Sequence, residues 1–476
     1  MSFLSDAEIV VAALEKYYQE SVSSQQPVIN QEPLEQIIEK LNLDAYIHDG
    51  GLTGKSLADF LDQYLATTTR VHHPEFVGHQ VAVPYYTGAL GSLIDGFTNN
   101  PMGVYELGPG ATSIEYFVVN WMLEKVGWQP APLNSQVAAE NRLHGGGILT
   151  HGGTLANLTA LLAARNQVAP EAWEMGIPHD LALLAPAEAH YSIARAAAIL
   201  GIGQKGIYQL EVDENGTILP ERLMLALERL QNDGKRPIAL VANAGQTGVG
   251  TYDPLEEIGE FCHTHHIWFH VDGAHGASAL LSEKYRHSLR GVEKADSLTW
   301  DAHKMLRTPS LCAASLFRDH HHIESAFQQE ASYLFHEKNQ PGIDLVHLTF
   351  ECTKAGLALK LFLVLGALGE RGLGEYIERQ WDLALRTYEY IKQQPDFECA
   401  VRPQSNIVCF RITGSDQKQL HIRDALIAQG HFYLTSTSFQ GKRYLRLTLM
   451  NPDTTIEDMQ RLINMIRKIA EGIVLD

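Results

Sequence analysis

Residues 267–276 read Ile-Trp-Phe-His-Val-Asp-Gly-Ala-His-Gly, and the interpretation of the whole chain starts from them. The apolar run predicts a buried strand that delivers the carboxylate of Asp272 at its carboxyl end. The small residues that follow, Gly273 and Ala274, allow a flat ligand to approach the backbone closely. A carboxylate in this position calls for a cationic partner, although a helix N-cap or a salt bridge would give the same pattern.

A second strand-like run supplies a lysine. Residues 297–304 read Ser-Leu-Thr-Trp-Asp-Ala-His-Lys, which brings Lys304 to the rim of the same sheet, 32 positions after Asp272 (304 − 272). Shielding at such a rim lowers the pKa of a lysine and makes its amine a nucleophile toward carbonyl groups. A His-Lys pair is also common on protein surfaces without any function, so Lys304 indicates a site only in combination with the other residues around it.

Short apolar or β-branched runs alternate with helical stretches across the middle of the chain. This alternation predicts an α/β domain with a mostly parallel, seven-stranded sheet and helices on both faces. Ligands of such sheets bind beyond the carboxyl ends of the strands, so chemistry is expected in the residues after each run. The runs cover residues 147–150, 181–185, 207–211, 237–242, 267–271, 297–300 and 313–317.

The flanking segments have other patterns. Apolar residues at helical spacing predict an N-terminal helical arm for dimerisation over residues 1–84. The large ligand-binding domain is expected over residues 85–370, and a small α+β domain over residues 371–476. The expected elements after the sheet are helices over 345–368 and 375–393, strands over 397–401, 406–412 and 443–449, and a terminal helix from Ile456.

Composition narrows the function. The 476 residues include 37 basic and 56 acidic side chains, a net charge of −19, which disfavours nucleic-acid and anionic-membrane partners and favours a small-molecule function. The five scattered cysteines indicate reduced core residues rather than disulfides or a zinc site. Because residues 355–368 are too few to span a bilayer and the N-terminus lacks a signal-peptide pattern, the sequence predicts a soluble, cytoplasmic protein.

Gly152-Gly-Thr154 follows one of the predicted strands and opens a helix, so its backbone N–H groups can cradle an anion, although a plain glycine turn looks the same. Together with His190, Asp272 and Lys304, all at strand ends, it completes the set that pyridoxal 5'-phosphate needs. That set is an amine for the aldehyde, a carboxylate for the ring nitrogen, N–H groups for the phosphate and a flat partner for the ring. The histidine clusters at 263–266 and 320–322 lack a suitable carboxylate arrangement, so no metal site is predicted.

A series of motifs follows one order along the chain: His73-Pro74, Gly145-Gly-Gly, Gly152-Gly-Thr154, Ala189-His190-Tyr-Ser, Ala244-Gly-Gln-Thr247, His270-Val-Asp272-Gly-Ala274, Asp296-Ser, His303-Lys304 and Ser332-Tyr333-Leu. In this order and spacing the chain resembles the group II pyridoxal-phosphate-dependent decarboxylases. This family includes glutamate, cysteine sulfinate, diaminobutyrate and aromatic-amino-acid decarboxylases. The similarity runs from about residue 73 to residue 355 and more loosely beyond.

The resemblance implies fold type I of the pyridoxal enzymes, pyridoxal 5'-phosphate as cofactor, and a homodimer with the active site at the interface. It implies decarboxylation of an L-amino acid to a primary amine and CO2. The resemblance implies that Lys304 is the Schiff-base lysine, that Asp272 is the partner of the ring nitrogen, and that His190 stacks on the ring with Ala274 beneath its other face. It places Thr247 near the reacting centre and has Tyr333 reach the neighbouring subunit's site to protonate the decarboxylated intermediate. The residues that it implies at the phosphate are Gly152, Gly153, Thr154 and His303.

Departures from the family pattern leave parts of the site open. Asp301 stands where several relatives have Asn, which puts a direct phosphate contact in question. Lys354 stands where many relatives have Arg, so the anchor of the substrate α-carboxylate is not identified. His79 and Gln80 stand where aromatic-amino-acid decarboxylases carry bulky aromatics. These two are assigned to substrate binding and favour a polar substrate side chain, without separating acidic from amino side chains.

Two other interpretations remain. Transamination on the same cofactor would require Lys304 to move a proton between Cα and the cofactor carbon, and Tyr333 argues against it. A cofactor-free interaction protein on the same scaffold is disfavoured, because the lysine, the aspartate, the stacking histidine and the loop tyrosine are all retained.

Overall fold

The computed structural model describes residues 2–132, 143–327 and 342–472. Contacts divide the chain into two compact units. The large unit is Pro84–Arg379, and the small unit combines Met1–Val83 with Gln380–Asp476. The N-terminal and C-terminal segments, which the sequence predicts as separate domains, therefore group together. Each unit has its own sheet and its own apolar core.

The large unit contains a seven-stranded sheet in the order β1-β7-β6-β5-β4-β2-β3, within the described residues. Neighbours from β6 to β3 pair in parallel, whereas β7 runs antiparallel to both β6 and β1. The predicted mostly parallel sheet is thus confirmed. Its strands are β1 (Gly146–Thr150), β2 (Leu181–Pro186), β3 (Ile207–Leu210), β4 (Arg236–Asn243), β5 (Phe269–Asp272), β6 (Ser297–Asp301) and β7 (Ala313–Phe317).

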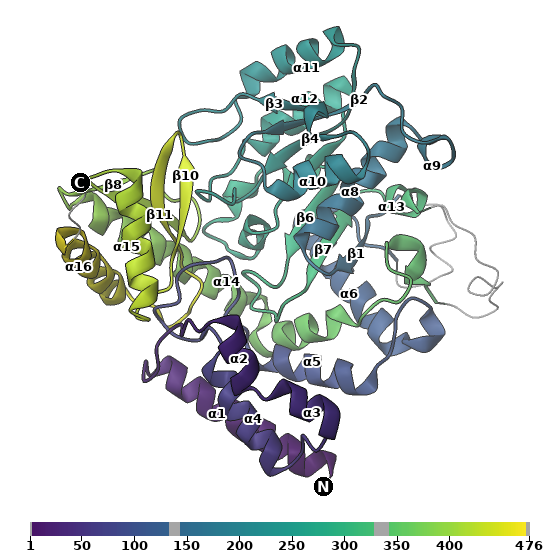
Figure 1. The fold of residues 1–476 in the computed structure, drawn as a ribbon. Helices are drawn as coiled ribbons and strands as arrows, with labels where there is room; N and C mark the ends of the chain where they lie inside the picture. Colours follow the sequence, from purple (N-terminus) through teal and green to yellow (C-terminus); the bar gives the residue numbers. More distant parts are fainter. Residues whose placement is uncertain (1, 133–142, 328–341, 473–476) are drawn as a thin grey trace. The chain divides into compact units, whose positions relative to one another are not determined.

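Helices cover this sheet. Every residue of β2, β5, β6 and β7 is buried, which requires cover on both faces. α8 packs against β4, β5, β6 and β7, and α10 lies beside it (Figure 1). The α-helices are α5 (Tyr86–Thr98), α6 (Pro109–Val126), α8 (Gly153–Val168), α9 (Ala172–Met175), α10 (Tyr191–Ile199), α11 (Leu223–Asn232), α12 (Leu255–His265), α13 (His320–Ala326) and α14 (Leu357–Lys392). The residues of α14 from Gln380 onward belong to the small unit.

Two local features set where helices begin and break. Gly152, just before α8, has φ 109°, a conformation that side chains rarely adopt, so a glycine is needed at this turn. α14 loses helical geometry at Gly369, where φ is 66°. Short 3₁₀ helices cover Tyr105–Leu107, Gln204–Gly206, Pro220–Arg222, Gly276–Leu281, Arg286–Leu289, Val292–Lys294 and Leu345–Leu348.

The small unit contains an antiparallel sheet in the order β10-β11-β9-β8. The N-terminal segment joins it through backbone bonds, since Val77 N–H donates to Tyr433 O (2.9 Å) and Val77 O accepts from Thr448 N–H (2.8 Å). Its elements are α1 (Phe3–Val22), α2 (Leu34–Lys40), α3 (Leu43–Asp49), α4 (Lys55–Ala66), β8 (Phe397–Cys399), β9 (Ile407–Ile412), α15 (Asp416–Ala428), β10 (Thr435–Phe439), β11 (Lys442–Thr448) and α16 (Ile456–Gly472).

Within the described residues, no helix has both the length and the apolar composition that crossing a membrane requires.

A buried ion pair lies behind β1. Lys354 Nζ is 2.8 Å from Glu115 Oε2 on α6, and both side chains are almost fully buried. Glu115 Oε1 accepts the N–H of Leu149 in β1 over 2.9 Å, and Lys354 O accepts the N–H of Met102 over 2.8 Å. The pair therefore ties a helix, a strand and a loop together, and Lys354 is engaged inside the core.

We predict that Lys354→Met lowers the free energy of unfolding by about 3–5 kcal/mol, because it leaves the Glu115 carboxylate buried without its cation. Denaturant unfolding of the purified protein measures this loss. The double variant Lys354→Met/Glu115→Gln keeps an acceptor for Leu149 and removes the unpaired charge, so it should recover most of the stability. A double variant as unstable as the single one would contradict this account.

His270 is a buried polar residue in the middle of β5. Its Nδ1 lies 2.8 Å from Ser297 Oγ on β6, and its Nε2 lies 3.1 Å from Asn157 Oδ1 on α8. Burial lowers the pKa of the imidazole to about 4, which outweighs the opposing attraction of Asp272. His270 is therefore neutral in the folded protein at neutral pH.

This lowered pKa makes folding sensitive to acid. The unfolded chain takes up a proton at His270 near pH 6.5, but the folded chain does so only near pH 4, so stability falls as the pH drops between these values. We expect His270→Gln to reduce the stability difference between pH 7 and pH 5 by about 2 kcal/mol. Denaturant unfolding at the two pH values measures it. Equal pH dependence in both proteins would show that His270 is not held neutral.

Candidate active site

A cavity of about 260 Å³ opens in the large unit where β1, β2, β4, β5 and β6 end. This is the carboxyl edge of the parallel strands, where ligands of such sheets bind. The cavity brings together the predicted site residues of the large unit: Gly152, Gly153, Thr154, His190, Thr247, Asp272, Ala274, His303 and Lys304. Residues 151–304 thus converge on one place, although more than a hundred positions separate the first from the last (304 − 151 = 153).

Asp272 is the last residue of β5 and is buried. Its Oδ1 accepts the backbone N–H of Ala274 over 3.2 Å, and its Oδ2 accepts Nδ2 of Asn157 over 2.9 Å. Both donors are neutral, so the negative charge is oriented by dipoles and is not cancelled. The carboxylate retains lone pairs for a further, cationic donor in the cavity.

Lys304 lies just beyond the end of β6. Its Nζ is 3.2 Å from Oδ2 of Asp301, and Nε2 of His303 is 3.6 Å from the same oxygen. Asp301 is only 2% exposed, and its Oδ1 has no hydrogen-bond partner among the described residues. Asp301 is therefore the partner of the lysine in this structure, a role that the sequence analysis did not foresee.

The start of α8 forms one wall. The first N–H groups of a helix have no acceptor within the helix, so those of Gly153 and Thr154 are available to an anion. A Cβ atom at Gly153 would lie 2.8 Å from both carboxylate oxygens of Asp301. Only glycine leaves the required space between this turn and β6.

His190 caps the N-terminus of α10. Its Nδ1 accepts the backbone N–H of Ser192 over 3.3 Å and lies 2.8 Å from Ser192 Oγ. Burial lowers the pKa of His190, against the attraction of Asp272. Because Nδ1 acts as an acceptor, the neutral ring carries its proton on Nε2.

Asn243, the last residue of β4, also lines the cavity. Its Nδ2 is buried and has no hydrogen-bond partner among the described residues. Its backbone N–H donates to Asp253, whose full burial raises its carboxyl pKa to about 7. The sequence analysis did not single out Asn243, so this donor was missed.

His79, Gln80 and Lys354 are not among the residues that line this cavity. His79 and Gln80 belong to the small unit, where His79 Nε2 is 3.0 Å from the Tyr433 hydroxyl and burial lowers the His79 pKa. Gln80 Nε2 is buried without a hydrogen-bond partner in the described part of the chain. Tyr333 lies outside the described residues. Lys354 is sealed in its pair with Glu115 and does not line the cavity.

Two of the histidines set aside in the sequence analysis, His320 and His321, form a cluster with Asp319. One ligand atom each of Asp319, His320 and His321 lie within 4.8 Å of one another. Asp319 caps α13 and accepts both the backbone N–H and Nδ1 of His321. Its carboxylate is thus already used in capping, and none of the three residues lines the cavity in the sheet.

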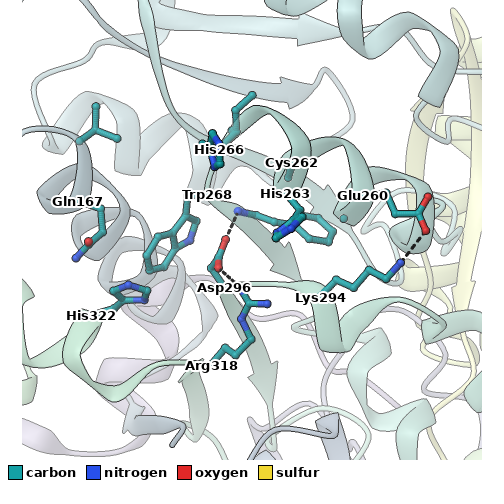
Figure 2. A pocket seen from close by; sticks show the side chains of 14 residues that line it. Gln167, Glu260, Cys262, His263, His266, Trp268, Lys294, Asp296, Arg318 and His322 are labelled. Carbon is teal, nitrogen blue, oxygen red and sulfur yellow. Dashed lines mark hydrogen bonds and ion pairs between the residues drawn. The ribbon is translucent and has the colours of Figure 1, made fainter. Parts of the chain in front are cut away.

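A larger cavity, of about 660 Å³, opens at the opposite ends of β5 and β6. Figure 2 shows that Arg318 points to Asp296 and Lys294 to Glu260, with separations of 2.5 Å and 2.9 Å. Trp268 forms part of the wall. The ion pairs of this cavity leave neither Asp296 nor Glu260 without a cation. At the carboxyl edge, by contrast, Lys304 is paired with Asp301, but the described residues offer Asp272 only neutral donors.

Comparison with known proteins agrees with this geometry. The mouse acidic amino acid decarboxylase GADL1 is 28% identical over 463 residues, which cover 93% of this chain and 81% of the relative. Mouse cysteine sulfinic acid decarboxylase is 31% identical over 373 residues, 77% of this chain and 73% of the relative. The crystal structure of mouse CSAD superposes with a TM-score of 0.85 at 25% identity, covering 98% of this chain and 100% of that one.

The family described as the pyridoxal-dependent decarboxylase conserved domain matches residues 40–413. The match covers most of the chain and includes every residue that lines the cavity at the carboxyl edge. The resemblance seen in the sequence motifs is confirmed, and with it the cofactor, pyridoxal 5'-phosphate. The chain belongs to the pyridoxal-phosphate-dependent amino-acid decarboxylases.

Proposed function

We propose that this enzyme decarboxylates an L-amino acid with a polar, acidic side chain to the corresponding primary amine and CO2. The observation that carries the proposal is the convergence of Lys304, Asp272 and His190 on one cavity at the carboxyl edge of the sheet. The acidic substrate class is supported by the relatives, which are named as decarboxylases of acidic amino acids and of cysteine sulfinic acid.

The cavity residues fit pyridoxal 5'-phosphate. Asn243 has a buried amide without a partner among the described residues, and the first N–H groups of α8 are available to an anion at the cavity wall. Asp272 has only neutral donors at its two oxygens and suits a protonated ring nitrogen. When bound, the cofactor supplies an aldehyde that bonds amines and a ring that withdraws electrons from Cα.

Each side chain then has a task. Lys304 would provide the amine that can bond to the aldehyde of the cofactor. Asp272 holds a proton at the ring nitrogen. The other assignments are His190 and Ala274 against the two ring faces, Gly152, Gly153, Thr154 and His303 around the phosphate, and Thr247 beside the reacting atoms.

Tyr333 is assigned the delivery of a proton to Cα after CO2 has left. It comes from the neighbouring subunit in this proposal, which requires a homodimer. Support for a dimer comes from α5, where apolar residues at positions i, i+4, i+7, i+8 and i+11 are 45–67% exposed: Tyr86, Leu90, Leu93, Ile94 and Phe97. Leu311, which lines the cavity, is 46% exposed as well. Burial of such a surface against a second copy would remove it from water.

His79 and Gln80 are the proposed polar contacts of the substrate side chain. An imidazole and a carboxamide can both donate to a carboxylate or a sulfinate. The cytoplasmic location remains a prediction from the sequence.

The substrate proposal predicts faster CO2 release from acidic amino acids than from their uncharged counterparts. Matched pairs are L-aspartate with L-asparagine and L-glutamate with L-glutamine, tested beside cysteine sulfinate, 2,4-diaminobutyrate and L-tryptophan. Release of CO2 and formation of the amine are both measured. Lys304→Ala should abolish turnover with every substrate while the circular-dichroism spectrum stays unchanged. Preference for diaminobutyrate or tryptophan would overturn the acidic assignment.

The dimer proposal predicts complementation between two defective subunits. Lys304→Ala lacks the amine, and Tyr333→Phe lacks the proton donor. Their heterodimer contains one site with both residues intact, so random exchange should restore about a quarter of the wild-type rate of amine formation. Amine formation is followed after subunit exchange has been verified with differently tagged chains. Absence of recovery would mean that Tyr333 does not act across subunits.

A further inference from the structure

A chain of hydrogen bonds leads through the core of the large unit to Asp272. Trp268 Nε1 donates to Ser297 Oγ over 2.8 Å, and Ser297 Oγ lies 2.8 Å from His270 Nδ1. His270 Nε2 lies 3.1 Å from Asn157 Oδ1, and Asn157 Nδ2 donates to Asp272 Oδ2 over 2.9 Å. All five residues are at most 8% exposed.

The chemistry of the groups fixes the direction of every bond. The indole of Trp268 can only donate, so the hydroxyl proton of Ser297 is free to point to His270 Nδ1. Burial keeps His270 neutral, so its one ring proton lies on Nε2 and is donated to Asn157 Oδ1. The chain therefore runs in one sense, from the indole toward the carboxylate.

The Asn157 amide also begins a second series of hydrogen bonds, which leads to His190. Asn157 Nδ2 also donates to Ser192 Oγ over 2.9 Å, and that hydroxyl lies 2.8 Å from His190 Nδ1. The Ser192 hydroxyl thus donates a hydrogen bond to His190 Nδ1, so the proton of the neutral ring lies on Nε2. Asn157 uses its one acceptor and both donor hydrogens, a combination that among uncharged side chains only a carboxamide offers.

We propose that Asn157 is a positioning residue that orients the Asp272 carboxylate toward the ring nitrogen of the cofactor and sets the tautomer of His190. The inference rests on the proposed role of Asp272. It extends that role to a residue that lies within the core and is anchored by His270. A hydrogen bond donated to a carboxylate stabilises its negative charge and fixes its rotamer.

The chain offers a matched control on the same helix. Asn166 is also in α8 and is 5% exposed, but its Nδ2 donates to the backbone oxygen of Ser325 over 2.9 Å, and it does not line the cavity. Asn157→Leu and Asn166→Leu therefore remove the same chemical group from the same element. Only the first touches Asp272.

The test compares two cofactors on the full-length protein. One is pyridoxal 5'-phosphate, and the other is its 1-deaza analogue, in which a C–H replaces the ring nitrogen. Equilibrium dialysis against the apo protein gives both dissociation constants, and their ratio isolates what the ring nitrogen contributes. Asn157→Leu should lower the preference for the natural cofactor by roughly tenfold. Asn166→Leu should leave the ratio at the wild-type value.

Asp272→Asn separates failure of this inference from failure of the proposed function. If Asp272→Asn leaves the ratio unchanged, Asp272 does not face the ring nitrogen and the proposed site is wrong. A second outcome is that Asp272→Asn abolishes the preference, whereas Asn157→Leu weakens the binding of both cofactors equally or does not weaken it at all. In that case the proposed role of Asn157 is wrong, but the proposed site remains valid.

His270→Phe provides a second route, because it removes the donor that anchors Asn157 Oδ1 and leaves the amide itself in place. It should reduce the same ratio, by less than Asn157→Leu does. Ser192→Ala interrupts only the branch to His190 and should leave the ratio unchanged. A normal ratio in His270→Phe would overturn the chain as the anchor of Asp272, even if Asn157→Leu did not fold.

Discussion

Charges that are buried at the rim of an apolar sheet need partners, and this constraint organises the large unit. Burial of an unpaired charge in a protein interior costs several kcal/mol of folding free energy. A buried charge therefore needs an opposite charge or hydrogen-bonding groups beside it. Asp301 has Lys304 at 3.2 Å, Glu115 has Lys354 at 2.8 Å, and Asp272 has two neutral donors. The carboxylates of Asp272 and Asp301, which line the cavity, are therefore held in place by neighbouring groups of the protein.

The sheet was predictable because its strands are continuous apolar runs, and such runs are typical of parallel strands buried on both faces. β10 was not, because Thr-Ser-Thr-Ser carries no apolar alternation and lies mostly on the surface of its sheet. The grouping of the N-terminal segment with the C-terminal segment could not be predicted from the sequence either. It depends on bonds such as that from Val77 to Tyr433, which join distant parts of the chain and leave no local pattern.

The site residues that the motifs indicated lie together where the structure describes them, because each follows a strand that ends at the same edge. The residues that sequence reasoning missed, Asn157 and Asn243, present side-chain amides whose surroundings depend on topology. Asn157 lies 115 positions from Asp272. In the sequence it is one of several polar residues of this helix. Its partners are identifiable only when α8 is placed against β5 and β6. The role of Asp301 was missed for a related reason. Its ion pair depends on the Lys304 side chain lying back toward the end of β6, and the sequence alone does not show this.

A polar chain inside an apolar core is favourable only if every member is satisfied. Ser297, His270 and Asn157 meet this condition, and loss of any one would leave its buried neighbours without partners, at about 1–3 kcal/mol each. The chain ends, however, on an anion whose donors are uncharged. Asp272 is therefore oriented by the core but not neutralised by it, so the remaining stabilisation must come from a cation that enters the cavity. A protonated pyridine nitrogen supplies that charge on a flat ring, which explains why small residues, Gly273 and Ala274, follow the carboxylate.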